Sequence, residues 1–279
     1  MKLLRVGPPG AETPAMIAPD GSTRDLSGHV RDFTADVLSP AGLAKLAAID
    51  FRTLHQFPSM RIGPCVPRPM NFVCIGLNYA DHAAETGAAI PKEPIIFLKS
   101  LGAFQGPNDD VHIPRGSKKT DWEVELAIVI GTKASYVPEN EAMSYVAGYC
   151  VVNDVSEREY QIERGGTWDK GKGCDTFGPT GPWLVTKDEI PHPGNLKMWL
   201  DVDGRRMQDG STKTMIFNVP KLVSYTSHFM TLYPGDIIST GTPPGVGLGM
   251  KPPTYLKGGE VMTLGIEGLG EQRQHVLAA

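Results

Sequence analysis

The stretch DWEVELAIVI, residues 121–130, places two glutamates at the start of a continuous apolar run that is rich in β-branched residues. Such a run predicts a β-strand that is buried on both faces. Side chains two positions apart on a strand point to the same face, so Glu123 and Glu125 are expected to lie side by side. Neighbouring carboxylates in an apolar element repel each other unless a cation or a proton neutralises them.

A third carboxylate, Asp154, ends a second apolar run, VAGYCVVND at residues 146–154. Three carboxylates at strand positions or strand ends suit a hard divalent cation such as Mg²⁺ or Mn²⁺, and both ions accept the same oxygen ligands. A Glu-x-Glu pair on the solvated face of an edge strand is a common alternative. The uninterrupted apolar run at residues 126–130 favours the buried strand, and with it a metal site formed by Glu123, Glu125 and Asp154.

The composition is typical of a globular chain with a substantial core and many turns. Of the 279 residues 41% are hydrophobic, 32 are glycine and 24 are proline, which favours strands joined by turns over a helical protein. A net charge of −4 and the lack of a Lys/Arg run argue against a nucleic-acid partner. The four cysteines form no Cys-x-x-Cys, and no apolar segment approaches the roughly 18 residues of a membrane span. We therefore expect reduced thiols, no membrane partner and a cytoplasmic location.

Motifs of several large enzyme classes are missing from the chain. It has no Gly-x-Ser-x-Gly elbow, no Walker phosphate loop and no His-Glu-x-x-His. The segment GVGLG at 245–249 fails the dinucleotide fingerprint, because Met250 occupies the position of the last glycine. Serine hydrolases of the elbow type, P-loop enzymes and Rossmann dehydrogenases are therefore disfavoured.

The order of elements predicts a mostly β chain with a few helices, an α+β fold in two units. Residues 1–66 form a small N-terminal unit, and a proline-rich junction leads to the larger unit at residues 67–279. Strands are expected at Lys2–Val6, Ala15–Ala18, Asn71–Gly76, Pro94–Leu98, Glu123–Ile130, Ala147–Val152, Trp183–Val185, Met198–Val202, Asp236–Ser239 and Val261–Ile266. Helices are expected from the Ser39 N-cap to about Ala48, over Ala80–Thr86 before Gly87, from the capping box SERE at 156–159 to Gly165, and over Val219–Leu232.

His82 and Glu85 are the first acid–base candidates. They lie three positions apart in a predicted helix, so they share one face and the carboxylate can orient the imidazole and raise its basicity. Such a dyad can take a proton from water near neutral pH, as a general base must. The alternative is an ordinary His/Glu pair on a helix surface, and spacing alone favours that alternative.

A second group of polar candidates lies further along the chain. Arg158 and Gln161 are three positions apart on a predicted helix and could bind a substrate carboxylate. Lys170 and Lys172 lie in a segment that either approaches a ligand closely or forms a mobile basic loop, and spacing does not choose between the two lysines. Thr242 belongs to a tight turn that could also present its hydroxyl and backbone amides to an anion.

Several segments together resemble the fumarylacetoacetate hydrolase family, and the resemblance runs from about Phe72 to Gly270. In chain order the matching segments are IGLNY (75–79) followed by His82-x-x-Glu85, DWEVEL (121–126), NDVSxR (153–158), WxKGK (168–172) and PGDIISTGTP (234–243). The resemblance implies a mixed β-sheet roll with a small N-terminal domain, usually assembled as a dimer.

The same resemblance implies roles for the candidate residues. It implies Mg²⁺ or Mn²⁺ held by Glu123, Glu125 and Asp154. It selects Lys172 as the active-site lysine and places His82 and Glu85 on a lid helix over the site. Tyr79, which ends the first matching segment, joins the substrate-binding candidates Arg158, Gln161 and Thr242.

The activity is also an expectation from resemblance. The bacterial branch that the chain most resembles contains acylpyruvate-type hydrolases, including hydrolases of 2,4-diketo-3-deoxy sugar acids. We therefore expect metal-dependent hydrolysis of a carbon–carbon bond in a 2,4-dioxo acid, which yields pyruvate and a carboxylic acid. The branch also contains 2-hydroxyhepta-2,4-diene-1,7-dioate isomerases, hydratases, oxaloacetate decarboxylases and ureidoglycolate lyases, so these activities stay open, as does a non-catalytic 2-oxo-acid-binding protein. The substrate of the eukaryotic hydrolase is not transferred, because that enzyme arranges its base differently.

Overall fold

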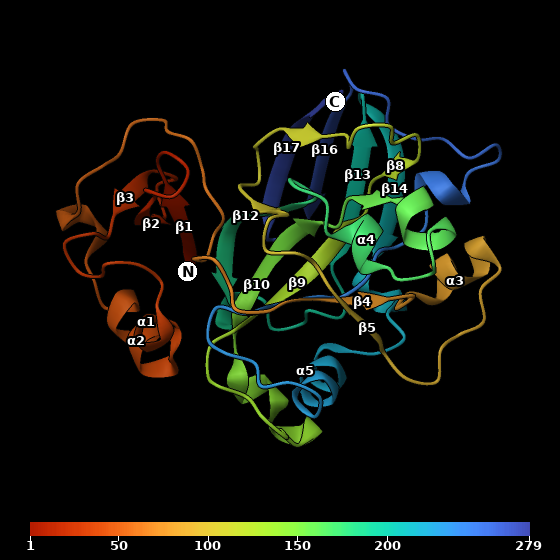
Figure 1. Cartoon of the computed structure of the whole chain (residues 1–279). Coiled ribbons are helices and arrows are strands. Elements are labelled where there is room, and N and C mark those ends of the chain that lie inside the picture. The colour runs from red at the N-terminus through yellow and green to blue at the C-terminus, as the bar shows by residue number, and fades with distance from the viewer.

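The computed structural model describes residues 1–279 and shows a mixed fold made mostly of strands, as the sequence predicts (Figure 1). Ten strands form the main sheet, in which neighbours are mostly antiparallel. Its spatial order is β3 (Thr23–Asp25), β2 (Thr13–Ile17), β1 (Lys2–Val6), β12 (Gly178–Thr186), β10 (Val146–Asn153), β9 (Val124–Ile130), β15 (Ile237–Ser239), β4 (Phe72–Gly76) and β5 (Ile95–Leu98), with β6 (Phe104–Gln105) pairing with β12 beside this path.

A five-stranded sheet packs against the main sheet, and a two-stranded ribbon lies near the site described below. The five strands are, in order, β14 (Arg205–Ser211), β13 (Lys197–Val202), β16 (Val261–Ile266), β17 (Gly270–Leu277) and β7 (Val111–His112). The ribbon consists of β8 (Thr120–Asp121) and β11 (Ser156–Glu157). Parallel pairing is limited to β15 with β4, β12 with β6, and β17 with β7, so both sheets are held mainly by antiparallel pairs.

Helices are short, and none of them is long and apolar enough to cross a membrane. The α-helices are α1 (Ala35–Leu38), α2 (Pro40–Ala47), α3 (Ala80–Thr86), α4 (Asp169–Lys172) and α5 (Val219–Ser227). Short 3₁₀ turns occupy Phe51–Thr53, Glu139–Tyr145, Lys187–Glu189, Thr212–Thr214 and Gly247–Gly249, and a π-helical turn occupies Glu159–Glu163.

The apolar run that ends DWEVELAIVI forms β9, a central strand between β10 and β15. All of its residues are buried, as the prediction of a two-faced strand requires. Leu126, Ile128 and Ile130 pack in a core cluster shared with the five-stranded sheet. Ala127 and Val129 point the other way, into a second cluster shared with the N-terminal region. Burial on both faces explains why no polar residue interrupts the run.

The N-terminal strands extend the main sheet. Lys2 and Leu3 of β1 pair with Val185 and Leu184 of β12, so the two predicted units share one hydrogen-bonded sheet. Figure 1 shows β1 to β3, α1 and α2 in red and orange at the side of the molecule, beyond β12. The division of the chain at residues 66 and 67 stays a prediction.

Three helix predictions meet different outcomes. Helix α3 has the predicted bounds and ends at Gly87, whose φ of 69° is the left-handed conformation that glycine adopts at low cost. Ser39 caps α2 as predicted, because its side chain accepts a 3.0 Å hydrogen bond from Gly42 N. Helix α5 is shorter than predicted. Leu232 pairs with Ala134 through two backbone hydrogen bonds and therefore cannot continue the helix.

The helix predicted from the capping box at residues 156–159 is wrong at its start. Ser156 belongs to β11 and donates its hydroxyl to Asp154 O at 2.9 Å instead of capping a helix. The backbone N–H of Glu159 donates to Glu157 Oε1 at 3.1 Å. Because β11 pairs with β8, only a π-helical turn over Glu159–Glu163 follows.

Candidate active site

Three carboxylates meet at one end of β9 and β10. One oxygen each of Glu123, Glu125 and Asp154 lies within 4.8 Å of the others, and all three residues are buried. The antiparallel register pairs Glu125 with Val152, two residues before Asp154, which brings the two strand ends together. The predicted clustering of the triad is therefore confirmed, and its function as a metal site stays a prediction.

Buried cations surround the triad. Lys172 Nζ lies 2.5 Å from Glu123 Oε2 and 2.8 Å from Asp154 Oδ2. Lys99 pairs with the other oxygen of Asp154 and donates to Val155 O at 3.1 Å. Burial alone would raise the pKa of Glu123, but Lys172 and Arg158 outweigh it and lower this pKa to about 2. Glu123 is thus held ionised.

The negative charge of Glu125 is less well compensated than that of Glu123. Its Oε2 accepts hydrogen bonds from Ser239 Oγ at 2.5 Å and from Gly241 N at 2.9 Å, and no cation pairs with it. Burial, followed by the charges of Asp154 and Glu123, raises the pKa of Glu125 well above its usual value. A carboxylate in this position needs a further positive charge to remain ionised.

The residues around the triad fit a divalent cation. Oxygen donors are the ligands of hard ions such as Mg²⁺ and Mn²⁺, and three carboxylate oxygens lie close together here. With all groups ionised, four carboxylates stand against three cations, which leaves one net negative charge. The carboxylates are Asp121, Glu123, Glu125 and Asp154, and the cations are Lys99, Arg158 and Lys172.

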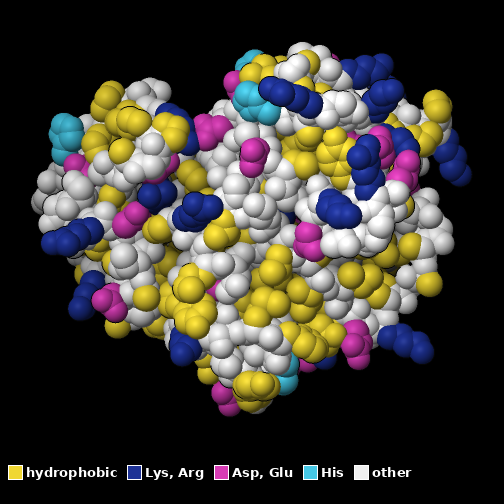
Figure 2. Space-filling view, in the orientation of Figure 1, with side chains coloured by type: hydrophobic (Ala, Val, Ile, Leu, Met, Phe, Trp, Pro, Cys, Tyr) yellow, Lys and Arg dark blue, Asp and Glu magenta, His cyan; other side chains and the backbone are white.

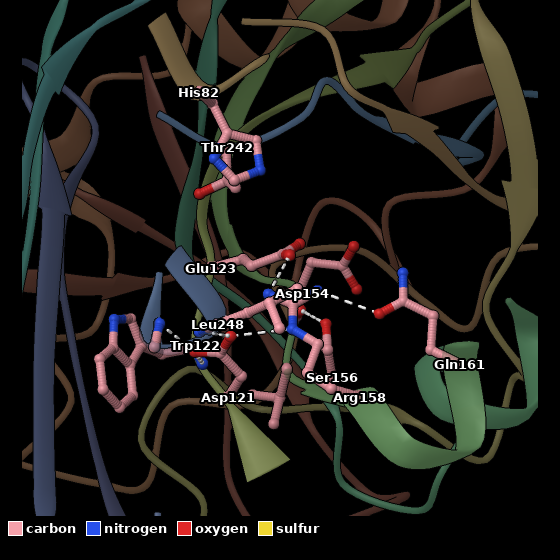
Figure 3. A network of polar contacts seen from close by, with 12 residues as sticks. His82, Asp121, Trp122, Glu123, Asp154, Ser156, Arg158, Gln161, Thr242 and Leu248 are labelled. Carbon is pink, nitrogen blue, oxygen red and sulfur yellow. Dashed lines mark hydrogen bonds and ion pairs between the residues drawn. The ribbon is translucent and has the colours of Figure 1, made fainter. Parts of the chain in front are cut away.

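Arg158 connects the triad with a second set of polar groups (Figure 3). Its Nη2 lies 2.6 Å from Glu123 Oε1 and its Nη1 donates to Gln161 Oε1 at 3.0 Å. Its Nε donates to Asp121 Oδ2 at 2.8 Å. The same aspartate accepts hydrogen bonds from Gly247 N at 2.6 Å and Leu248 N at 3.0 Å. These bonds hold the guanidinium in one orientation and connect it, through Asp121, to the segment that contains Gly247 and Leu248.

His82 and Glu85 form the predicted contact. His82 Nδ1 lies 3.1 Å from Glu85 Oε2, and the other oxygen of Glu85 accepts a 2.9 Å hydrogen bond from Gly245 N. A carboxylate at Nδ1 favours the tautomer with its proton there, which leaves Nε2 as the basic nitrogen. His82 is only 8% exposed and lines the same cavity as the triad, so it is not a surface pair of the kind that spacing favours.

One cavity of about 150 Å³ joins these groups. Most of the predicted site residues line it: His82, Glu123, Glu125, Asp154, Arg158, Gln161, Lys172 and Thr242. Glu85 does not line the cavity but contacts His82, which does. The other lining residues are mostly apolar, namely Ile75, Leu77, Phe97, Ile162, Trp168 and Leu248, together with Gly76, Thr86 and Gly241.

Tyr79 and Lys170 are not brought together with the others. Tyr79 is fully buried in the core, its hydroxyl donates to Met198 Sδ at 3.3 Å, and it does not line the cavity. Lys170 Nζ donates to Arg164 O at 2.8 Å on the surface, whereas Lys172 is buried beside the triad. The segment WDKGKG is not a loop throughout, because α4 occupies residues 169–172.

Thr242 has both hydrogen-bonding roles of its hydroxyl filled by the protein. Its Oγ1 donates to Val124 O at 2.9 Å and accepts from Gln208 Nε2 at 2.8 Å. Gln208 Oε1 in turn accepts from Val124 N at 2.9 Å. Thr242 and Gln208 thus fix the backbone between Glu123 and Glu125, and this structural role was not expected from the turn sequence.

Four residues of the site escaped the sequence reasoning: Lys99, Asp121, Gln208 and Ser239. Asp121 and Ser239 lie inside quoted motifs, so their type and position were visible but their partners were not. Lys99 and Gln208 carry no local signal, since a lone lysine after an apolar strand and a glutamine in a polar segment usually face water.

Known proteins share this architecture. The family model of the fumarylacetoacetate hydrolase C-terminal domain matches residues 71–277. A Burkholderia multivorans protein that carries the general name of a hydrolase is 62% identical over 281 residues, covering 100% of both chains. The fumarylacetoacetate hydrolase of Exiguobacterium antarcticum superposes with a TM-score of 0.89 at 33% identity over 100% of both chains.

Two further solved structures carry different activities in their names. A 2-hydroxyhepta-2,4-diene-1,7-dioate isomerase from Mycobacterium marinum has a TM-score of 0.80 and 32% identity, with 100% of this chain and 98% of that chain covered. A maleylpyruvate hydrolase from Sphingobium has a TM-score of 0.82 and 26% identity over 100% of both chains. The fold is thus similar to that of a hydrolase and an isomerase alike.

Proposed function

This chain belongs to the fumarylacetoacetate hydrolase family, and on that premise we propose that it is a divalent-metal-dependent hydrolase of a 2,4-dioxo acid of the acylpyruvate or diketo-deoxy sugar acid type. It cleaves the C3–C4 bond and releases pyruvate and a carboxylic acid. One observation carries the proposal: a buried carboxylate triad, a buried lysine and a His–Glu dyad share one small cavity. Binding alone needs no base beside a chelating group, so the dyad favours catalysis.

Glu123, Glu125 and Asp154 would hold Mg²⁺ or Mn²⁺. A bound cation supplies Lewis-acid polarisation of the 2-oxo acid head. Gln161 lines the cavity and its oxygen accepts a hydrogen bond from Arg158, so its amide nitrogen would be the donor for the head group. Arg158 itself positions Gln161 and Glu123.

His82 would take a proton from water through Nε2, while Glu85 stabilises the positive imidazolium ring that results. The activated water attacks the C4 carbonyl, and the C3–C4 bond then breaks with its electron pair on the pyruvate fragment. This fragment leaves as an enolate, and it becomes pyruvate when C3 takes the proton that His82 received from water. The ammonium group of Lys172 lies at the triad and stabilises the negative charge that develops there.

The decisive experiment is product identification. The protein, supplied with Mg²⁺ or Mn²⁺, is incubated with 2,4-dioxopentanoate and related 2,4-dioxo acids, and products are measured by NMR. Hydrolysis gives pyruvate and a second carboxylic acid in equal amounts, and a chelator stops the reaction. A broad panel that yields no such pair would overturn the proposal.

An isomerase is the second candidate, and the similarity to the Mycobacterium marinum isomerase favours it. The same triad and lysine could stabilise an enolate without any attack by water. Tautomerisation changes the absorption of the substrate but conserves its mass, and decarboxylation of oxaloacetate releases CO₂. A 2-oxo-acid-binding protein would bind oxalate or pyruvate tightly and convert no member of the panel.

The family resemblance also leads us to propose a homodimer. Leu98 on the edge strand β5 is 42% exposed, and Phe229 just after α5 is 64% exposed. Figure 2 shows hydrophobic side chains gathered on this part of the surface. Light scattering at several protein concentrations would give the molar mass, and a constant monomer mass would contradict the proposal.

A further inference from the structure

Every cation that lines the cavity is already paired with the protein. The three guanidinium nitrogens of Arg158 contact Asp121, Glu123 and Gln161. The ammonium of Lys172 contacts two carboxylates of the triad. Both cations therefore face the metal end of the cavity, and neither is free to receive a carboxylate at the far end.

Basic residues outside the cavity lining, on segments next to Ile162 and Trp168, are engaged as well. Arg164 Nη2 lies 2.6 Å from Glu159 Oε1, and Lys119 pairs with Glu163. Lys170 Nζ donates to a backbone carbonyl, as described above. Apart from His82, Arg158 and Lys172, no basic residue lines the cavity, and Ile162 and Trp168 are among its aliphatic and aromatic lining residues. A second carboxylate of a substrate would therefore find no unpaired lysine or arginine among the lining residues.

The net charge of the four carboxylates and three cations around the triad also disfavours a second substrate carboxylate. The one net negative charge of these groups becomes one positive charge when a divalent cation is added. A single substrate carboxylate neutralises that charge. A second carboxylate would leave an excess negative charge at the site, which is unfavourable unless a further cation pairs with it.

We propose that the substrate carries one carboxylate, that of the 2-oxo acid head, and an uncharged group beyond C4. This inference rests on the proposed function and narrows its substrate class. It separates the protein from enzymes of dicarboxylates, such as the 1,7-dioate in the name of the Mycobacterium marinum isomerase.

Two matched pairs of compounds test the inference. For turnover, 2,4-dioxoheptanoate is compared with 2,4-dioxoheptanedioate, which differs only by a carboxylate in place of the terminal methyl group. For binding, 2-oxohexanoate is compared with 2-oxohexanedioate by calorimetry in the presence of Mg²⁺. We expect kcat/KM and affinity to favour each monoacid by at least about tenfold, since an unpaired buried charge costs more than the 1.4 kcal/mol that a factor of ten represents.

The two readouts separate this inference from the proposed function. Preferential or equal hydrolysis of the dioate overturns the inference and leaves the hydrolase intact. Selective binding of the monoacid without any hydrolysis supports the inference and overturns the hydrolase. Binding of neither 2-oxo acid overturns both.

A charge-introducing variant strengthens the test. Ile162 lines the cavity and is 51% exposed, so the variant Ile162→Lys places a new ammonium at the mouth with little cost to folding. The neighbouring carboxylates Glu159 and Glu163 already have partners. We expect the ratio of dioate to monoacid kcat/KM to rise about tenfold in Ile162→Lys and to stay unchanged in the neutral control Ile162→Met. An unchanged ratio in the lysine variant would overturn the inference.

Discussion

Asp121 Oδ2 accepts a 2.8 Å hydrogen bond from Arg158 Nε, and both side chains are buried. Through Oδ1 and Oδ2 the same carboxylate also accepts the N–H groups of Gly247 and Leu248. The loop that these amides belong to reaches Glu85 through Gly245 N. One aspartate outside the triad thus connects the arginine beside the triad with the loop that supports the His–Glu dyad.

The variant Asp121→Asn is expected to lower the kcat/KM of the protein that remains folded, in addition to any loss of stability. An asparagine keeps one acceptor for Trp122 N and Gly247 N but loses the charged contact with Arg158 and the bond from Leu248 N. We expect a loss of at least about tenfold in kcat/KM, since a buried hydrogen bond to a charged group contributes about 1.5–3 kcal/mol. Steady-state kinetics on the folded fraction measures it.

Asp236→Asn is the matched control for that variant. Asp236 is equally buried and accepts four N–H groups from Met70, Asn71 and Tyr233, but it does not touch the cavity. We expect a lower free energy of unfolding with unchanged kcat/KM. Equal kinetic losses in both variants would mean that Asp121 has only a structural role.

Replacing His82 with alanine should separate turnover from metal binding. The imidazole is proposed to activate water, and general acid–base catalysis contributes about 10²–10⁴-fold. We expect kcat to fall by about that factor, while calorimetric titration shows unchanged Mn²⁺ affinity because His82 is outside the triad. Undiminished turnover would exclude His82 as the base.

Lys170 and Lys172 form an internal comparison. Lys172 lies at the triad, whereas Lys170 lies on the surface. We expect Lys172→Met to lower turnover by about 10²-fold or more, because it removes one charged group that stabilises the transition state. We expect Lys170→Met to leave turnover unchanged. Kinetics of the two variants at saturating metal measures the difference. Similar activities in both would remove Lys172 from the mechanism.

Glu125→Gln should weaken metal binding without destabilising the metal-free protein. A glutamine oxygen can still accept from Ser239 Oγ and Gly241 N, and the repulsion from Glu123 and Asp154 disappears. In the wild type, Mn²⁺ should raise Tm, because an ion that binds only the folded state adds about 2.7 kcal/mol at a hundredfold excess over Kd.

Thermal unfolding with and without Mn²⁺ measures both effects. We expect the shift of Tm by Mn²⁺ to be lost in Glu125→Gln and retained in Glu157→Gln, which alters a buried glutamate bonded to Ser117 and Thr120. A full shift of Tm in Glu125→Gln would contradict the assignment of Glu125 as a ligand.

Much of the main sheet was predictable because its strands bury both faces. The apolar runs at residues 126–130 of β9 and 146–152 of β10 signal strands without any knowledge of their neighbours. Strands β14 and β17 were missed. Their sequences RRMQDGS and GEQRQHVL are largely polar, although Gln208, Gln272 and Gln274 are buried and hydrogen-bonded. Pairing with β13 and β16 decides their conformation, and no local property reports it.

The sequence by itself determined the strand that carries Glu123 and Glu125, the helix that brings His82 to Glu85, and the family to which the chain belongs. These features depend on local periodicity and on segments whose residues stand in a recognisable order. Only the tertiary structure decided that Asp121 holds Arg158, and that Gln208 and Lys99 support the site. Such contacts join residues far apart in the chain, and their energies depend on burial and on partners that a linear pattern does not contain.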